Sequence, residues 1–348
     1  MKRIENKKVY SMLILSAVLV TSTLSNAQDK DIGQISGYAF GDYYFASEHH
    51  NPAIEGMNGF WFRRIYLTYD KKIDNEFATR LRLEMNSPGD FTSSSTLNPY
   101  VKDAYLQYSK GNVKAYLGMS PTPTWDNIDT MIGFRPVEKS PIDLYKMGEA
   151  RDTGISIKTT LDKNKKTTAW LMFGNGSGTR GETDKGKAIY GMLGHWLTPE
   201  IYVEGYADFW DKPGDTDWRT VSAWAMFQKD NFRVQVLGAN QRRERPGMSD
   251  LDLTVLSFYT DVKVSKNAKA FFRADFVSNP VPDADKIAYH SLATNARPTL
   301  YIVGVDFALT ENVHIIPNIE FVTYDDPVTG TEPDDDIFPR LTFFYVWK

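Results

Sequence analysis

The sequence predicts an all-β protein, a closed antiparallel β-barrel of 16 strands that spans a membrane, with long extracellular loops and short periplasmic turns. Three observations lead to this fold class. Apolar and polar side chains alternate with a period of two in segments that recur about every 20 residues. The connections between these segments alternate between short and long. After the N-terminal segment, no run approaches the ~20 apolar residues of a membrane-spanning helix, so only a closed barrel would cross a membrane.

The N-terminal segment is typical of a secretory signal peptide. Residues 1–8 hold four basic side chains, residues 9–24 form an apolar run, and residues 25–27 suit the cleavage position. Cleavage is expected after Ala27, which makes residues 1–27 the signal peptide and residues 28–348 the barrel. A retained membrane anchor is the alternative, but Ser and Thr interrupt the apolar run and no second flank follows it.

Charge and the absence of cysteine narrow the function classes. The formal net charge is -4, and loss of four basic residues and one acidic residue with the signal peptide changes it to about -7. A mildly acidic exported chain is a poor nucleic-acid binder. The sequence contains no Cys, which excludes a disulfide scaffold, a thiolate metal site and a lipid anchor on an N-terminal Cys. No feature of the sequence points to a cofactor.

Residues 59–88 show the strand pattern most clearly. Apolar and polar positions alternate on both sides of the polar turn 70–76, which predicts an antiparallel hairpin. Burial of charged groups in a dry core is costly, so the polar face is expected to meet water. That face carries Arg64, Tyr66, Thr68, Arg80, Arg82 and Glu84, and the apolar face carries Ile65, Leu67, Tyr69, Phe77, Leu81, Leu83 and Met85.

The same alternation defines the other strands in chain order, and their aromatic and β-branched residues favour sheet. The short connections are rich in Asp, Asn, Lys or Gly, as tight turns are. Tight turns at one end and open loops at the other are the polarity of outer-membrane barrels. The predicted strands cover residues 35–47, 59–70, 76–86, 99–108, 113–120, 153–161, 167–174, 187–197, 200–210, 218–228, 232–241, 252–264, 268–278, 299–309, 313–324 and 337–347.

A secreted soluble sandwich or propeller is the alternative fold, because a soluble sheet also has one apolar face. A closed ring of ~16 strands instead leaves an aqueous lumen. Aromatic residues also gather at the strand ends, as two interface girdles would. They are Tyr69, Phe77, Phe227, Phe232, Phe307 and Trp347 near short turns, and Trp61, Phe209, Trp218, Phe276 and Tyr301 near long loops.

Four short motifs resemble those of the phosphate-selective porin O and P family. They are Phe62-Arg63-Arg64, Val101-Lys102-Asp103-Ala104-Tyr105-Leu106, Gly118-Met119-Ser120-Pro121 and Arg151-Asp152-Thr153-Gly154. The similarity is best over residues 59–157. The resemblance implies a 16-stranded outer-membrane porin, a homotrimer, that passes anions such as phosphate or other small hydrophilic solutes.

The longest connection, residues 121–152, exceeds what a plain connector needs, which suggests a functional role. We expect it to fold inward and narrow the pore; an extracellular flap is the alternative. Its candidate constriction residues are Trp125, Arg135, Lys139, Lys146 and Arg151.

The water-facing positions of the strands supply candidate pore-lining residues of both signs. We hypothesise a basic, anion-attracting wall in the first strands that faces a more acidic wall near Glu204 and Asp208. Solvated lumen charges without selectivity are the alternative. The candidates for solute binding are Arg64, Arg80, Arg82, Lys114, Lys158, Glu84, Asp103, Glu204 and Asp208, with Arg233, Arg273, Arg340, Asp261, Asp275, Asp306 and Glu320 also predicted on the lumen face.

Other kinds of site have weaker support in the sequence. Of the five histidines, His49, His50 and His290 lie in predicted loops, and none has a nucleophile elbow or metal-binding spacing beside it. We therefore predict no catalytic and no metal-binding residues. The acidic loop 325–337 is interpreted as solvated rather than as a divalent cation site. A surface receptor or adhesin on a barrel anchor, without channel activity, is the second function class, and a barrel enzyme is the third.

Overall fold

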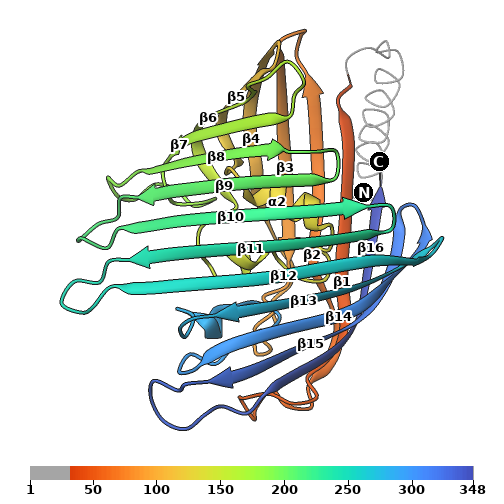
Figure 1. The fold of residues 1–348 in the computed structure, drawn as a ribbon, viewed down its shortest axis with the longest axis vertical. Coiled ribbons are helices and arrows are strands. Elements are labelled where there is room, and N and C mark those ends of the chain that lie inside the picture. Colours follow the sequence, from red (N-terminus) through yellow and green to blue (C-terminus); the bar gives the residue numbers. More distant parts are fainter. Residues whose placement is uncertain (1–31, 348) are drawn as a thin grey trace, which may run out of the picture. The chain divides into compact units, whose positions relative to one another are not determined.

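The computed structural model describes residues 32–347, so the predicted signal peptide, residues 1–27, lies outside the described residues. In the described part, sixteen strands form one closed antiparallel sheet in which each strand pairs with its neighbours in sequence. The ring closes where β1 pairs with β16, for example Tyr38 with Val346 and Tyr44 with Arg340 (Figure 1). The predicted fold class is confirmed.

Every predicted strand is present, and each begins and ends within two residues of the prediction. The strands are β1 (Gln34–Phe45), β2 (Asn58–Lys72), β3 (Phe77–Asn86), β4 (Asn98–Lys110), β5 (Val113–Pro121), β6 (Arg151–Thr160), β7 (Thr167–Gly174), β8 (Ala188–Trp196), β9 (Ile201–Trp210), β10 (Trp218–Lys229), β11 (Phe232–Arg243), β12 (Leu251–Ser265), β13 (Ala268–Val277), β14 (Arg297–Thr310), β15 (Val313–Asp325) and β16 (Asp336–Trp347).

Three short helices lie in the long connections of the described part of the chain. The segment between β5 and β6 contains α2 (Trp125–Ile132) and α3 (Pro141–Leu144), and the segment between β13 and β14 contains η1 (Ala284–Lys286). None of the helices in residues 32–347 combines the length and the apolar content that crossing a membrane requires.

The outer face of the ring is apolar. Leu117, Leu171 and Leu193, on three different strands, are 61%, 64% and 53% exposed. Each alternates with an inward-facing neighbour, so the period of two in the sequence separates an apolar outer face from a mixed inner face. A continuous exposed apolar surface of this extent is unfavourable in water and suits contact with hydrocarbon.

Apolar side chains also fill part of the interior. Trp125 and Ile128 of α2 are fully buried, and they pack in one cluster with inward-facing residues of the wall such as Trp224 and Leu253. In Figure 1, α2 lies inside the ring of strands. The space open to water is therefore much narrower than the ring itself.

Local irregularities place consecutive charged residues on the inner face. In β4 the register shifts so that Arg82 pairs with Asp103 and Leu83 pairs with Val101, which leaves Lys102 as the extra residue of a β-bulge. Lys102 and Asp103 consequently both point inward, where Lys102 Nζ lies 3.0 Å from a Glu84 oxygen. In a regular strand one of the two would face outward.

β2 also has two consecutive charged residues with inward contacts, and this corrects part of the predicted girdle. Arg63 and Arg64 both make contacts with inward-facing groups, so the residues before them have the opposite orientation to that predicted. Trp61 therefore points inward and donates from Nε1 to Asp42 Oδ2 at 3.2 Å. Trp218 also packs against the interior cluster. The prediction that these two tryptophans belong to the outer girdle is wrong.

Candidate functional site

The connection between β5 and β6 is tied to the far inner wall through its backbone. Arg273 of β13 donates to the carbonyl oxygen of Lys139 at 2.5 Å, and Arg243 of β11 donates to that of Lys146 at 2.8 Å. Arg233 of β11 donates to Ile132 O at 2.7 Å. These wall arginines therefore hold the loop in place, because an ionised donor to a carbonyl makes a strong hydrogen bond.

Side chains of the loop dock on the same wall. The Trp125 ring is fully buried and meets the Tyr206 ring edge-on, with 5.4 Å between centroids. Tyr145 donates to Asp275 Oδ2 at 3.0 Å. Glu204, expected to form an acidic wall across water, instead lies under the loop and accepts from the side chains of Thr124 and Asn127.

Asp208 lies in the same buried region of β9. It accepts from the Tyr206 hydroxyl at 2.5 Å and from the backbone N–H of Thr220 at 3.0 Å. Glu204 and Asp208 are only 5% and 7% exposed. They therefore support the loop rather than face the basic residues across an open lumen.

On the opposite side, a cavity of about 370 Å³ remains between the loop and strands β1 to β4. The described residues that line this cavity include five basic and three acidic side chains. The basic ones are Arg80, Arg82, Lys102, Arg135 and Arg151, the acidic ones are Asp126, Asp129 and Asp143, and Tyr38, Phe40, Tyr66, Thr130, Pro136, Ala150 and Phe344 complete the lining. Of the predicted pore residues, the fold thus brings Arg80, Arg82, Arg135 and Arg151 together.

Asp103 and Arg151 form the centre of the charge network behind this cavity. Arg151 Nε lies 2.5 Å from Asp103 Oδ1, and its Nη1 lies 2.7 Å from Asp126 Oδ1 on α2. Arg82 Nη1 lies 3.4 Å from the other oxygen of Asp103. The side chain of Asp103 is completely buried, so its negative charge neutralises the bases from behind rather than facing the water.

Glu84 has the same position behind a second pair of bases. Arg64 Nε lies 2.7 Å from one of its oxygens and Lys102 Nζ lies 3.0 Å from the other. The Glu84 side chain is 1% exposed, whereas the two bases are 12% and 17% exposed. Strands β3 and β4 therefore present Arg80, Arg82 and Lys102 to the cavity, while the carboxylates of Glu84 and Asp103 lie beneath them.

Arg135 lies on the loop side of the cavity, beside two acidic residues of the same loop. Its guanidinium lies 3.5 Å from Asp129 and 3.9 Å from Asp143. Burial raises the pKa of Asp129 to about 6 even though Arg135 opposes the shift. Burial likewise lowers the pKa of Lys139 to about 8, against the attraction of Asp143. Two groups of the loop thus titrate close to neutral pH.

The other predicted residues lie away from the cavity centre. Lys158 Nζ lies 4.2 Å from the centre of the Trp170 ring, and Lys114 is its cross-strand partner. Lys146 donates to Asp283 O at 3.0 Å on the exposed side of the loop. Arg80 reaches the cavity but is also held by Asp70, with two hydrogen bonds of 2.7 and 2.9 Å.

Sequence reasoning missed two residues of this site. Arg63 donates from Nη2 to Glu138 Oε2 of the loop at 2.7 Å, and Lys102 lines the cavity. A signal was present, because a strand with two consecutive charged residues must either expose one of them on its apolar face or contain a bulge.

No protein-family model matches the sequence, and no curated protein sequence matches it. The resemblance to the phosphate-selective porin O and P family therefore stays a prediction. Solved structures do share the fold. An anion-selective porin from Comamonas acidovorans has a TM-score of 0.68 and 12% sequence identity, and the match covers 91% of this chain and 100% of that chain.

Two further structures are similar over nearly their whole length. OmpT of Vibrio cholerae in a trimer form, an outer-membrane protein, has a TM-score of 0.63 and 13% identity over 92% of this chain and 100% of that chain. The outer-membrane channel DcaP of Acinetobacter baumannii has a TM-score of 0.61 and 11% identity over 92% and 99%. The chain is thus a 16-stranded β-barrel of the kind these outer-membrane proteins have.

Proposed function

We propose that this protein is a passive diffusion channel of the bacterial outer membrane for small hydrophilic solutes. The observation that carries the proposal is the charged cavity inside a ring whose outer face is apolar. A closed ring leaves no unpaired strand edge, which is the condition for a sheet to lie in hydrocarbon. The similar solved structures are a porin, a channel and another outer-membrane protein, and they support the same environment.

The loop between β5 and β6 is the element that narrows the pore. It is bound to the β9 to β13 wall by arginine and tyrosine side chains, so the passage is restricted to the side of β1 to β4. A cavity of about 370 Å³ fits small solutes rather than folded or polymeric ones.

Small anions are the preferred solutes in this proposal. Basic side chains outnumber acidic ones in the described cavity lining by five to three, and the partner carboxylates Glu84 and Asp103 are buried behind the bases. Rings of Arg and Lys favour anions, and the forked guanidinium suits the oxygens of phosphate. The similar porin from Comamonas acidovorans is anion-selective, which agrees with this assignment.

Planar-bilayer recordings of the purified protein test both parts of the proposal. Discrete current steps are expected, and the reversal potential in a salt gradient should indicate anion preference. Arg80→Ala combined with Arg82→Ala should shift it toward cations, whereas Arg80→Lys with Arg82→Lys keeps the charge and serves as the control. Unchanged ion preference in the alanine variant would show that Arg80 and Arg82 do not determine the ion selectivity. A protein that inserts and gives no current steps would instead be a receptor or adhesin.

We also propose a homotrimer. The support is the trimer form of the similar Vibrio cholerae protein and the exposed apolar outer face, which offers area for contacts between copies. Native mass spectrometry from detergent should show three chains per particle, and a single chain would exclude this assembly.

A further inference from the structure

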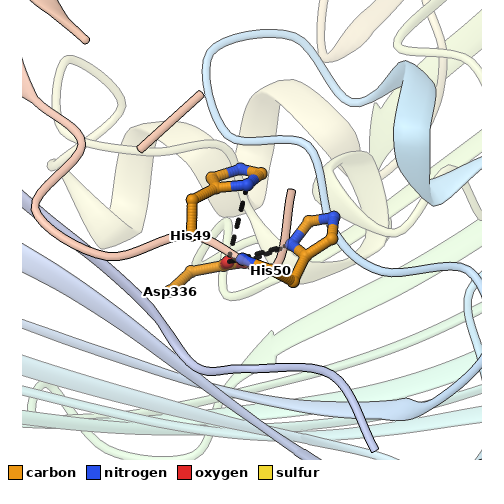
Figure 2. A group of neighbouring side chains, drawn as sticks. All are labelled: His49, His50 and Asp336. Carbon is orange, nitrogen blue, oxygen red and sulfur yellow. Dashed lines mark hydrogen bonds and ion pairs between the residues drawn. The ribbon is translucent and has the colours of Figure 1, made fainter. Parts of the chain in front are cut away.

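Two histidines of the β1–β2 loop lie beside the first residue of the last strand. His50 Nδ1 is 2.9 Å from Asp336 Oδ1, and His49 Nδ1 is 3.9 Å from the same oxygen. Figure 2 shows the two rings close to the Asp336 carboxylate, joined to it by these contacts. The three candidate ligand atoms all lie within 4.8 Å of one another. Barrel closure between β1 and β16 explains why residues so distant in the sequence meet.

The spacing of these atoms fits a small divalent metal ion. Zinc bonds to imidazole nitrogen and carboxylate oxygen of ~2.0–2.2 Å place tetrahedral ligands about 3.3–3.6 Å apart. The observed separations of 2.9 and 3.9 Å from Asp336 fall on either side of that range. Each of these two contacts thus lies within about 0.4 Å of the separation that tetrahedral zinc ligands have.

A third histidine is aimed at the same carboxylate. His290 Nε2 lies 3.5 Å from Asp336 Oδ2, and its Nδ1 is 2.9 Å from Glu320 Oε2. His290 is only 3% exposed, yet its Nε2 makes no hydrogen bond to any described residue. Leaving a buried ring nitrogen without a partner is costly.

The second contact of His290 is the arrangement that metal-ligating histidines have. A carboxylate that accepts from one ring nitrogen fixes the tautomer and directs the lone pair of the other nitrogen toward the metal. Glu320 is itself held at 2.6 Å by Arg340, so the orientation is stable. With Nδ1–H donated to Glu320, Nε2 faces the Asp336 carboxylate at 3.5 Å, and either a proton on Nε2 or a cation between the two groups would remove the repulsion.

The Nδ1 lone pair of His49, the candidate ligand atom of this ring, already accepts a backbone hydrogen bond. The backbone N–H of Asn51 donates to His49 Nδ1 at 2.9 Å, which shows that this nitrogen is the acceptor of the ring. A metal ion would replace that single hydrogen bond. Its Nε2, like that of His290, is buried without a hydrogen-bond partner among the described residues.

We propose that His49, His50, His290 and Asp336 bind one borderline divalent transition metal ion, of which Zn²⁺ is the representative. Imidazole nitrogens with a single carboxylate suit this class, whereas Ca²⁺ and Mg²⁺ require a shell of oxygens. The ion would join the β1–β2 loop to β16 at the seam where the barrel closes. This site is independent of the proposed channel function, since it can be measured without any current.

The test uses tag-free protein in detergent, stripped with a chelator and dialysed against ZnCl₂, with bound zinc measured by mass spectrometry. One Zn²⁺ per chain is expected. Loss of a residue that only hydrogen-bonds to a metal ligand lowers metal affinity about 10–100-fold. His49→Ala with His50→Ala removes two ligands themselves, so it should weaken zinc binding by at least about 100-fold. His195→Ala with His314→Ala is the matched control and should bind as the wild type does. His314 is suited to this role because it also contacts a carboxylate, Asp306, at 2.7 Å.

A second measurement does not depend on the variants folding. Modification of histidines in the wild-type chain by diethylpyrocarbonate should be suppressed by Zn²⁺ at His50 and not at His195 or His314. Retention of one zinc by the His49/His50 variant, the absence of tight zinc binding in the wild type, or equal modification at His50 with and without zinc would each overturn the proposal. The last two outcomes would mean that a proton, and not a metal ion, lies between His290 Nε2 and Asp336.

Discussion

Arg151 Nε and Asp103 Oδ1 lie 2.5 Å apart in the barrel interior, and this contact joins the first residue of β6 to the bulge of β4. The same guanidinium holds Asp126 of α2 at 2.7 Å. One side chain therefore connects the β5–β6 loop to the wall that it faces. The cavity depends on this connection, because both of its sides meet at Arg151.

The first prediction concerns the stability of this connection. Among the described residues, Arg151→Ala leaves the fully buried Asp103 with the longer 3.4 Å contact to Arg82, and removal of one partner of a buried pair costs about 3–5 kcal/mol. Arg151→Lys keeps the charge but lacks the fork that serves two carboxylates, so an intermediate loss is expected. Urea unfolding in detergent, followed by tryptophan fluorescence, measures both. An alanine variant as stable as the wild type would contradict this account.

The strand pattern could be predicted because it depends on local rules. A period of two and polar turns located all sixteen strands in the described chain, since an apolar outer face imposes the alternation on every strand. Bulges break that alternation at single residues. For this reason the inward position of Lys102 did not follow from the pattern.

The candidate sites were harder to predict than the strands, because they depend on long-range contacts. Glu204 occupies an inward position as predicted, but whether such a residue faces water or the loop depends on how the loop folds. His50 and Asp336 are 286 residues apart in the sequence, and neither has a motif around it. Closure of the ring places the loop after the first strand beside the start of the last strand. Only this closure could have suggested that the two residues lie close together.

The second prediction tests how the loop is anchored. A Cβ atom at Gly148 would lie 2.6 Å from the ring of Trp125, so Gly148→Ala must displace a fully buried tryptophan. Overpacking of this kind costs about 1–3 kcal/mol, and a displaced Trp125 should loosen the loop and raise single-channel conductance. Gly181→Ala is the control, because nothing lies within 4 Å of its Cβ position. Equal conductance of the two variants would show that Trp125 does not hold the loop.

The third prediction is that anion preference decreases in two steps as the pH rises, one near pH 6 and one near pH 8. Lys139, with a pKa lowered to about 8 by burial, loses its positive charge as the pH rises through that value, so anion preference should fall. Asp129, with a pKa raised to about 6 by burial, loses its negative charge as the pH falls through that value, so anion preference should rise. Reversal potentials recorded between pH 5 and 9 measure both steps.

Variants assign these two steps to their residues. Lys139→Met should remove the alkaline step and keep the acidic one, and Asp129→Asn should do the reverse. Lys139→Arg retains a positive charge at all these pH values and should also remove the alkaline step. Its anion preference should be higher than that of Lys139→Met. An alkaline step that persists in Lys139→Met would have to come from another group, and the assignment to Lys139 would be wrong.

The fourth prediction separates a metal site from a structural histidine cluster through a residue that would not touch the metal. Glu320→Gln keeps an oxygen that accepts the proton of His290 Nδ1 but removes the negative charge that increases the basicity of the ring. Zinc affinity should therefore fall about 10–100-fold, as it does when a carboxylate behind a metal-bound histidine is lost. Asp306→Asn, which alters the equivalent carboxylate beside His314, is the control and should leave zinc binding unchanged.

Thermal unfolding with and without ZnCl₂ makes this comparison independent of any general loss of stability in the Glu320 variant. Arg340 loses the negative charge of its 2.6 Å partner, so the melting temperature of the metal-free Glu320→Gln protein should fall. Zinc adds a stabilisation free energy that is set by its affinity and concentration and that is observed as an additional rise in melting temperature. That rise should be smaller in Glu320→Gln than in the wild type and unchanged in Asp306→Asn. An equal zinc-induced rise in all three proteins would show that Glu320 does not orient a metal ligand, and that the buried contact with His290 serves the fold alone.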